Sequence, residues 1–254
     1  MNDSTFLYGA QVRANDIRQH YLRYGGNKDQ RAERDAVIII PGITSPAVTW
    51  GLVAERFGRQ YDTYILDVRG RGLSEASGAL DYSLDAQAAD LNAFASALGL
   101  SKYAFVGHSM GGRIAIRAAS HHPIGLTRVV AVDPPVSGPG RRAYPANLPW
   151  YIDSIRMACK GISLEQMREF CPSWSDEQLR LRAQWLHTCD ERAIVASFNA
   201  FQMDDIHADL PHIAVPLMLM SAERGDVIRE DEVSEIRALV PSLHEKRVSN
   251  ACLL

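Results

Sequence analysis

Short apolar runs recur along the chain, and each is followed by a turn and then by an amphipathic stretch. Most of these runs are continuous and rich in Val, Ile and Leu, which is typical of strands covered on both faces of a parallel sheet. We expect strands at residues 36–40, 63–68, 103–108, 128–133, 215–222 and 245–248. Because strands alternate with helical patterns, the sequence predicts an α/β layer fold.

The N-terminal segment has a different pattern. Residues 5–25 contain two stretches of alternating polar and apolar residues, separated by Ala14, Asn15 and Asp16. Alternation is typical of strands that have one face in water, so we expect an antiparallel hairpin that leads into the sheet.

One long segment, residues 137–209, has no strand pattern. Besides the helices expected at 85–98 and 111–119, helical patterns cover residues 148–160, 163–170, 175–188 and 190–203. Ser163 with Gln166, and Ser175 with Gln178, have the spacing of capping boxes. We expect residues 137–209 to form a helical lid over the carboxyl edge of the sheet, inserted after the sixth strand. The core is then residues 1–136 and 210–254.

Composition and charge exclude several classes of protein. The 254 residues carry 27 Lys and Arg against 30 Asp and Glu, a formal charge of −3, so no basic excess exists to neutralise nucleic-acid phosphates. The apolar runs are far shorter than the roughly 20 residues of a membrane helix, and no apolar leader precedes the first strand. The four cysteines have no zinc-site spacing, which favours reduced thiols in a cytoplasmic protein without a metal.

Residues 107–111, Gly-His-Ser-Met-Gly, match the pattern G-x-S-x-G. They stand directly between an expected strand and an expected helix, which is the setting that a nucleophile elbow requires. Ser109 is therefore the expected nucleophile. The alternative is a serine that caps an ordinary turn between a strand and a helix.

Two further loops follow expected strands. In the turn Pro41-Gly42-Ile43, the main-chain N–H of Ile43 is expected to form an oxyanion hole together with the N–H of Met110. Residues 67–74, Asp-Val-Arg-Gly-Arg-Gly-Leu-Ser, are similar to the D-x-R-G-x-G-x-S loop common in α/β-hydrolases. We expect this loop to be structural, with Arg69 holding it in place.

Taken together, residues 7–250 resemble the α/β-hydrolase superfamily. The matching stretches resemble one branch, the N-formylmaleamate deformylases of nicotinic acid degradation; they are residues 41–51, 66–74, 107–111, 133–145, 148–156 and 175–189. The resemblance implies a Ser-His-Asp hydrolase that cleaves the N-formyl amide of N-formylmaleamate to maleamate and formate without a cofactor. Another amide or ester hydrolase of this fold, or a non-catalytic protein of this fold, is the alternative.

Two aspartates compete for the acid of the triad. Asp133 ends one expected strand and Asp226 follows the next, and the resemblance favours Asp133. The family's histidine falls at Leu253, and the helix that follows the last strand in the family is not expected in this sequence. Without that histidine, we expect this chain to be a poor hydrolase.

The implied substrate is a small anionic amide, so its pocket should contain a cation. Arginine binds carboxylates through two parallel hydrogen bonds, and the candidates in the expected lid are Arg141, Arg142 and Arg182. Tyr144 and His187 are further candidates for contact with the substrate. The alternative for each is solvation or packing. No nucleic acid or membrane partner is expected.

Overall fold

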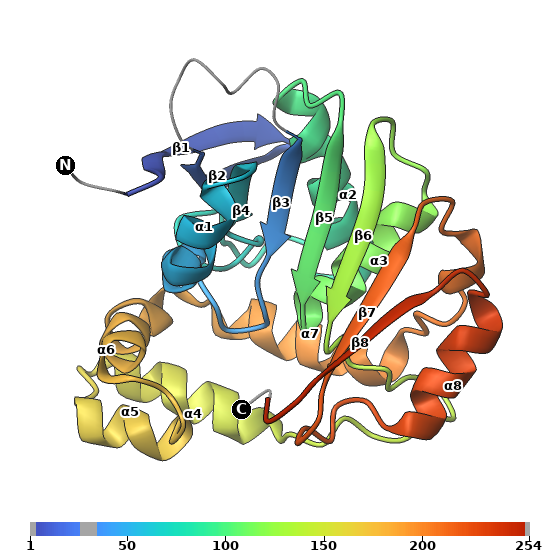
Figure 1. The fold of residues 1–254 in the computed structure, drawn as a ribbon. Helices are drawn as coiled ribbons and strands as arrows, with labels where there is room; N and C mark the ends of the chain where they lie inside the picture. The colour runs from blue at the N-terminus through green and yellow to red at the C-terminus, as the bar shows by residue number, and fades with distance from the viewer. Residues whose placement is uncertain (1–3, 26–34, 252–254) are drawn as a thin grey trace.

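The structure is a computed structural model that describes residues 4–25 and 35–251. These residues form an eight-stranded sheet in the order β1-β2-β4-β3-β5-β6-β7-β8 (Figure 1). The strands are β1 (Phe6–Ala14), β2 (Ile17–Tyr24), β3 (Ala36–Ile40), β4 (Asp62–Leu66), β5 (Tyr103–His108), β6 (Leu126–Val132), β7 (Leu217–Ala222) and β8 (His244–Val248). Strand β2 pairs antiparallel with β1 and β4, and every pair from β4 to β8 is parallel. The predicted mostly parallel sheet is confirmed.

The N-terminal hairpin forms where it was expected. Ala14 pairs with Ile17 across the turn, and the two turn residues, Asn15 and Asp16, have φ angles of 49° and 59°. Asn and Asp tolerate this left-handed conformation, and two such residues in succession are typical of a tight hairpin turn.

The central strands are buried on both faces, as their continuous apolar runs predict. Ile38, Ile39 and Ile40 of β3 have no exposed surface. Ile40 pairs with Gly107 of β5, so the carboxyl ends of these two strands lie side by side. The register therefore brings the turn after β3 next to the turn after β5, which contains Ser109.

Helices cover both faces of the sheet and its carboxyl edge (Figure 1). The α-helices are α1 (Gly51–Gly58), α2 (Leu84–Ala97), α3 (Met110–Ser120), α4 (Leu148–Cys159), α5 (Leu164–Phe170), α6 (Asp176–Trp185), α7 (Glu191–Met203) and α8 (Glu230–Leu239); the short 3-10 helices are η2 (Ala47–Trp50), η3 (Leu186–Thr188) and η4 (Leu210–His212). Helix α1 lies on one face and α2 and α3 on the other, whereas α4 to α7 lie beyond the carboxyl ends of the strands. Both expected capping boxes are present, at the starts of α5 and α6.

The loop after β4 is held as expected from the sequence. Arg69 donates two hydrogen bonds of 2.5 Å to the carboxylate of Asp90 on α2, and both side chains are buried. Asp67 accepts the amide of Ala47 at 2.6 Å and that of Leu73 at 3.0 Å. These contacts hold the loop against α2 and the turn after β3.

Candidate active site

Ser109 occupies a sharp turn between β5 and α3. Its backbone has φ 53° and ψ −120°, a conformation that non-glycine residues rarely adopt. The turn is held by hydrogen bonds from Ser109 N to Val132 O at 2.8 Å and from Gly112 N to Ser109 O at 2.9 Å. A side chain at Gly111 would have its Cβ 2.0 Å from Ile40 O, so this approach of helix to strand requires glycine. These features are those of a nucleophile elbow.

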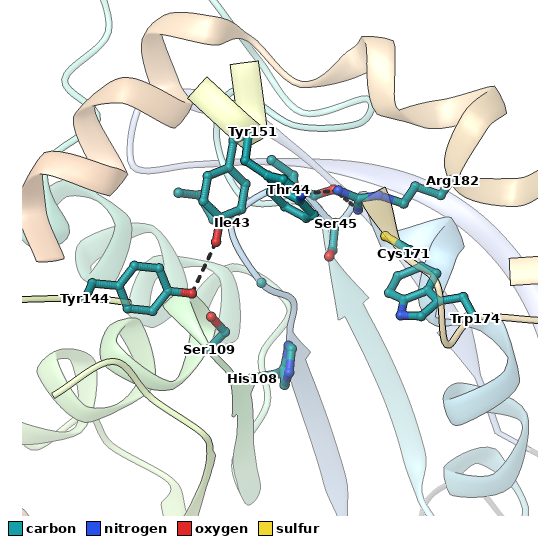
Figure 2. Close-up of a pocket in the computed structure, with 12 residues that line it drawn as sticks. Ile43, Thr44, Ser45, His108, Ser109, Tyr144, Tyr151, Cys171, Trp174 and Arg182 are labelled. Carbon is teal, nitrogen blue, oxygen red and sulfur yellow. Dashed lines mark hydrogen bonds between the residues drawn. The ribbon is translucent and has the colours of Figure 1, made fainter. Parts of the chain in front are cut away.

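The Ser109 side chain faces a small pocket of about 60 Å³ (Figure 2). The turn after β3 forms one side, the elbow forms the floor, and residues from the segment between β6 and β7 form the remaining walls. The lining residues are Gly42, Ile43, Thr44, Ser45, His108, Ser109, Tyr144, Trp150, Tyr151, Cys171, Trp174 and Arg182. The pocket is therefore formed jointly by the sheet and by the helical segment at its carboxyl edge.

Two main-chain amides stand at this pocket without an acceptor. Ile43 lies in the turn after β3 and lines the pocket, and Met110, the first residue of α3, directly follows the lining residue Ser109. Among the residues that the structure describes, neither Ile43 N nor Met110 N donates a hydrogen bond. Donors of this kind, fixed by the backbone on either side of a nucleophile, can stabilise an oxygen that becomes negatively charged.

Two tyrosines stand above Ser109. The hydroxyl of Tyr144 lies beside the Ser109 side chain and 3.2 Å from the hydroxyl of Tyr151 (Figure 2). Burial raises the pKa of both phenols, so both are protonated at neutral pH. Tyr144 can therefore donate a hydrogen bond to a molecule bound at Ser109.

Arg182 is the cation of the pocket. It is 4% exposed and donates to Thr44 through Nη1···O at 3.1 Å and Nη2···Oγ1 at 3.0 Å (Figure 2). Its guanidinium carbon lies 5.6 Å from the centroid of the Trp174 ring. Its Nε has no partner, and within residues 4–25 and 35–251 no carboxylate forms an ion pair with it. Because Arg182 also lines the pocket, its charge could pair with an anionic group bound there.

The structure brings Tyr144 and Arg182 to the pocket but not the other expected substrate residues, Arg141, Arg142 and His187. Arg141 is bound to both oxygens of Glu235, at 2.7 and 2.8 Å, and Arg142 is bound to Glu232 at 2.9 Å. His187 is exposed on η3. Acidic groups on α8 thus hold the first two arginines away from Ser109, and of the three candidate arginines Arg182 lines the pocket.

Asp133 follows β6 and lines a second cavity, of about 190 Å³, which also contacts His108 and Ala251. Its φ of 44° turns the chain sharply, and its Oδ1 accepts the amide of Ala222 at 2.9 Å. Burial raises the pKa of this carboxyl group, and the hydrogen bond from Ala222 opposes that effect. Asp133 is 6% exposed, so an ionised carboxylate here would favour a cationic partner.

Asp226 is exposed and lines neither of the two cavities. Its carboxylate accepts hydrogen bonds of 2.7 and 3.0 Å from Arg229, which lower its pKa. The two candidate acids therefore have opposite environments, and Asp133 is the one that lines a cavity beside the elbow.

The position expected for the base, Leu253, lies outside the described residues. Ala251, two positions earlier, lines the Asp133 cavity. His108 lines both cavities, and its ring stacks at 5.2 Å against Trp50. Its Nδ1 is buried without a partner, and burial lowers its pKa to about 4. The imidazole of His108 is therefore neutral at pH 7.

Several lining residues were not predicted from the sequence. Thr44 and Ser45 directly follow Ile43, the expected oxyanion residue. Their position next to Ile43 is the feature of the sequence that could have indicated that they line the pocket. Cys171 and Trp174 lie between α5 and α6, where no pattern marks them. Over the described parts of the chain, no cluster of three His, Cys, Asp or Glu residues is arranged to hold a metal, and no helix is long and apolar enough to cross a membrane.

Comparison with known proteins agrees with this geometry. Residues 35–252 match the family model of the alpha/beta hydrolase fold. An N-formylmaleamate deformylase from Pseudomonas putida is 59% identical over 248 residues, which cover 98% of this chain and 90% of that protein. A crystal structure of the N-formylmaleamic acid deformylase Nfo, a serine-to-alanine variant from another strain of that species, superposes with a TM-score of 0.91 at 48% identity, over 97% of this chain and 94% of that one. An E-2-(acetamidomethylene)succinate hydrolase shares the fold, with a TM-score of 0.76 and 18% identity, over 98% of this chain and 92% of that chain.

Proposed function

This chain belongs to the alpha/beta hydrolase fold family, and from that premise we propose that it hydrolyses the N-formyl amide of N-formylmaleamate to maleamate and formate. The relative with 59% identity is an N-formylmaleamate deformylase, and the match extends over nearly the whole chain. The substrate is a small anion, so its pocket must combine a nucleophile with a cation.

The observation that carries the proposal is that Ser109 and Arg182 line one pocket. Arg182 has a free Nε and no carboxylate partner among the described residues, so a substrate carboxylate can supply the missing charge. Arg182 is 4% exposed, and its low exposure reduces the screening of an ionic hydrogen bond by water. Arg141 and Arg142 do not have this role, because glutamates already neutralise them.

In the proposed mechanism, the hydroxyl oxygen of Ser109 attacks the formyl carbon. The carbonyl oxygen becomes negatively charged and is bound by the amides of Ile43 and Met110. The C–N bond then breaks, maleamate leaves with a proton on its nitrogen, and a formyl ester remains on Ser109. Water hydrolyses that ester and releases formate.

The proton must be carried by a base, and the expected position of that base is 253. Two residues of extended chain span at most about 7 Å. Because Ala251 lines the Asp133 cavity, a histidine at 253 has the reach to enter the space between Asp133 and Ser109. Asp133 would orient that histidine and stabilise its charged form. Leu253 cannot accept a proton, which predicts weak turnover in this chain.

In this proposal residues 137–209 act as a lid and residues 1–136 and 210–254 as the core. Helices α4 to α7 belong to the lid, which contributes six lining residues to the pocket: Tyr144, Trp150, Tyr151, Cys171, Trp174 and Arg182. The described cysteines, Cys159, Cys171 and Cys189, are free thiols, which supports a cytoplasmic location.

The test is release of formate from N-formylmaleamate by three proteins: the chain as it stands, its Leu253→His variant, and the same variant with Ser109→Ala. General-base catalysis contributes about 10²- to 10⁴-fold, so we expect Leu253→His to raise kcat by that factor. Ser109→Ala should abolish the gain. If Leu253→His binds maleamate but releases no formate, the protein is a non-catalytic member of this fold and the proposal is wrong.

A further inference from the structure

Arg71, in the loop after β4, is a buried cation without a carboxylate partner. It is 1% exposed, and no ion pair is formed by its guanidinium within residues 4–25 and 35–251. Its hydrogen-bond acceptors are the neutral groups Ile43 O at 3.1 Å, Arg69 O at 2.8 Å, Met110 Sδ at 3.4 Å, Ala193 O at 3.2 Å and Ser197 Oγ at 2.8 Å.

These acceptors connect the turn after β3, the elbow and helix α7. Ile43 and Met110 carry the two free amides beside Ser109, and Ala193 and Ser197 lie on helix α7. One planar group with fixed donor directions therefore sets the position of the turn after β3 relative to the elbow and to α7. A neutral side chain of similar volume could fill this space without the cost of burying a charge.

We infer that Arg71 is a positioning residue for the oxyanion hole, and that its unneutralised charge stabilises the negative oxygen formed at Ser109. The inference rests on the proposed serine mechanism. It assigns a function to the second arginine of the loop at residues 67–74, which the sequence alone identified as structural. Although burial lowers its pKa to about 10, the guanidinium is still charged at neutral pH.

Arg113 provides a matched control. It is also 1% exposed, burial likewise lowers its pKa to about 10, and it also binds main-chain carbonyls, including that of Ala200 on α7. Among the described residues, its guanidinium donates no hydrogen bond to Ile43 or Met110. Loss of Arg113 should therefore cost similar stability without disturbing the two amides.

The first measurement is hydrogen–deuterium exchange of the full chain and its Arg71→Met, Arg71→Lys and Arg113→Met variants. We expect Arg71→Met to increase exchange at least 10-fold in a peptide covering residues 41–46, because the turn loses its bond to Ile43 O. Arg71→Lys should give a smaller increase, and Arg113→Met should leave this peptide within 2-fold of the parent chain.

The second measurement is the acylation of Ser109 by p-nitrophenyl acetate, corrected with Ser109→Ala. Oxyanion donors contribute about 10²- to 10³-fold, so we expect Arg71→Met to lower the acylation rate roughly 100-fold, with KM within 2-fold. Arg71→Lys should recover about 10-fold of that loss. Arg113→Met should keep an acylation rate within 3-fold of that of the parent, although its Tm should fall about as much as that of Arg71→Met. Unchanged exchange at 41–46, or an unchanged acylation rate, overturns the inference. Because an activated ester replaces N-formylmaleamate, failure of the deformylase proposal would be seen separately in the formate assay.

Discussion

Replacing Arg182 by methionine removes a buried positive charge while keeping most of the side-chain volume. The variant loses two hydrogen bonds to Thr44 and the contact with the Trp174 ring. Those losses affect every substrate alike, because they alter the pocket wall. The loss of the charge affects substrates that carry a carboxylate.

The size of the second effect follows from the structure. Arg182 is 4% exposed and has no competing anion among the described residues, so a substrate carboxylate would form a charge-assisted hydrogen bond there. Such a bond contributes about 1.5–3 kcal/mol. At about 1.4 kcal/mol per factor of ten, this corresponds to a loss of roughly 10- to 150-fold in kcat/KM.

The assay compares kcat/KM for N-formylmaleamate and for its neutral methyl ester, measured in the Leu253→His background with and without Arg182→Met. We expect the charged substrate to lose the additional 10- to 150-fold relative to the neutral one. Arg142→Met is the control, because Glu232 already neutralises that arginine, and it should change the ratio less than 3-fold. An equal loss for both substrates in the Arg182 variant would refute the assignment of Arg182 as the carboxylate site.

Three other predictions concern the acid, the pH dependence and the helix caps. In the Leu253→His background, Asp133→Asn should lower kcat by about 10³-fold or more and Asp226→Asn by less than 3-fold, measured by formate release; the reverse order would make Asp226 the acid. Since the pKa of His108 falls from its usual 6.5 to about 4 in the fold, the unfolded chain binds more protons between these values. The free energy of unfolding should therefore fall by about 2–3 kcal/mol as His108 is protonated in the unfolded chain between pH 6.5 and 4. The His108→Gln variant should show a smaller fall of Tm over that pH range than the parent chain, and an equal fall in both would contradict the prediction. Ser163→Ala removes the capping box of α5 and should lower the free energy of unfolding by about 1 kcal/mol in urea titrations, whereas Ser163→Asp should restore most of it.

The central strands could be predicted from the sequence because they are continuous apolar runs, which are typical of strands buried on both faces. The expected strand at 36–40 is observed as Ala36–Ile40, and that at 103–108 as Tyr103–His108. Helix α1 has a weaker pattern, because it is short and buries Ala54 and Gly58 alone. Helix α8 also has a weak pattern, because half of its residues are charged and its buried residues are Val233 and Ile236. Few buried positions leave little periodicity to detect.

The elbow could be predicted for a similar reason, since Ser109 and its glycines are contiguous. Which of Arg141, Arg142 and Arg182 lines the pocket could not be predicted from the sequence. Helix α6 is polar, and its periodicity does not show that Arg182 packs against Thr44 while Arg141 meets Glu235, 94 positions away. These contacts depend on how α6 and α8 pack against the core. Local sequence therefore predicted the sharp turn that holds Ser109, whereas the placement of Arg182 in the pocket depends on tertiary packing.

The close approach of helix α3 to strands β3 and β5 at Gly107 and Gly111 determines which positions near Ser109 can be mutated. Gly107 and Gly111 leave no space for a Cβ, because its nearest neighbours would be main-chain atoms at 2.2 and 2.0 Å. Selection should recover no substitutions there, whatever the substrate. Trp150, Cys171 and Trp174 line the same pocket from a segment outside the sheet. They are not part of the close main-chain approach at Gly107 and Gly111. Directed evolution toward other acyl groups should therefore accumulate changes in residues 144–182 while the elbow stays invariant.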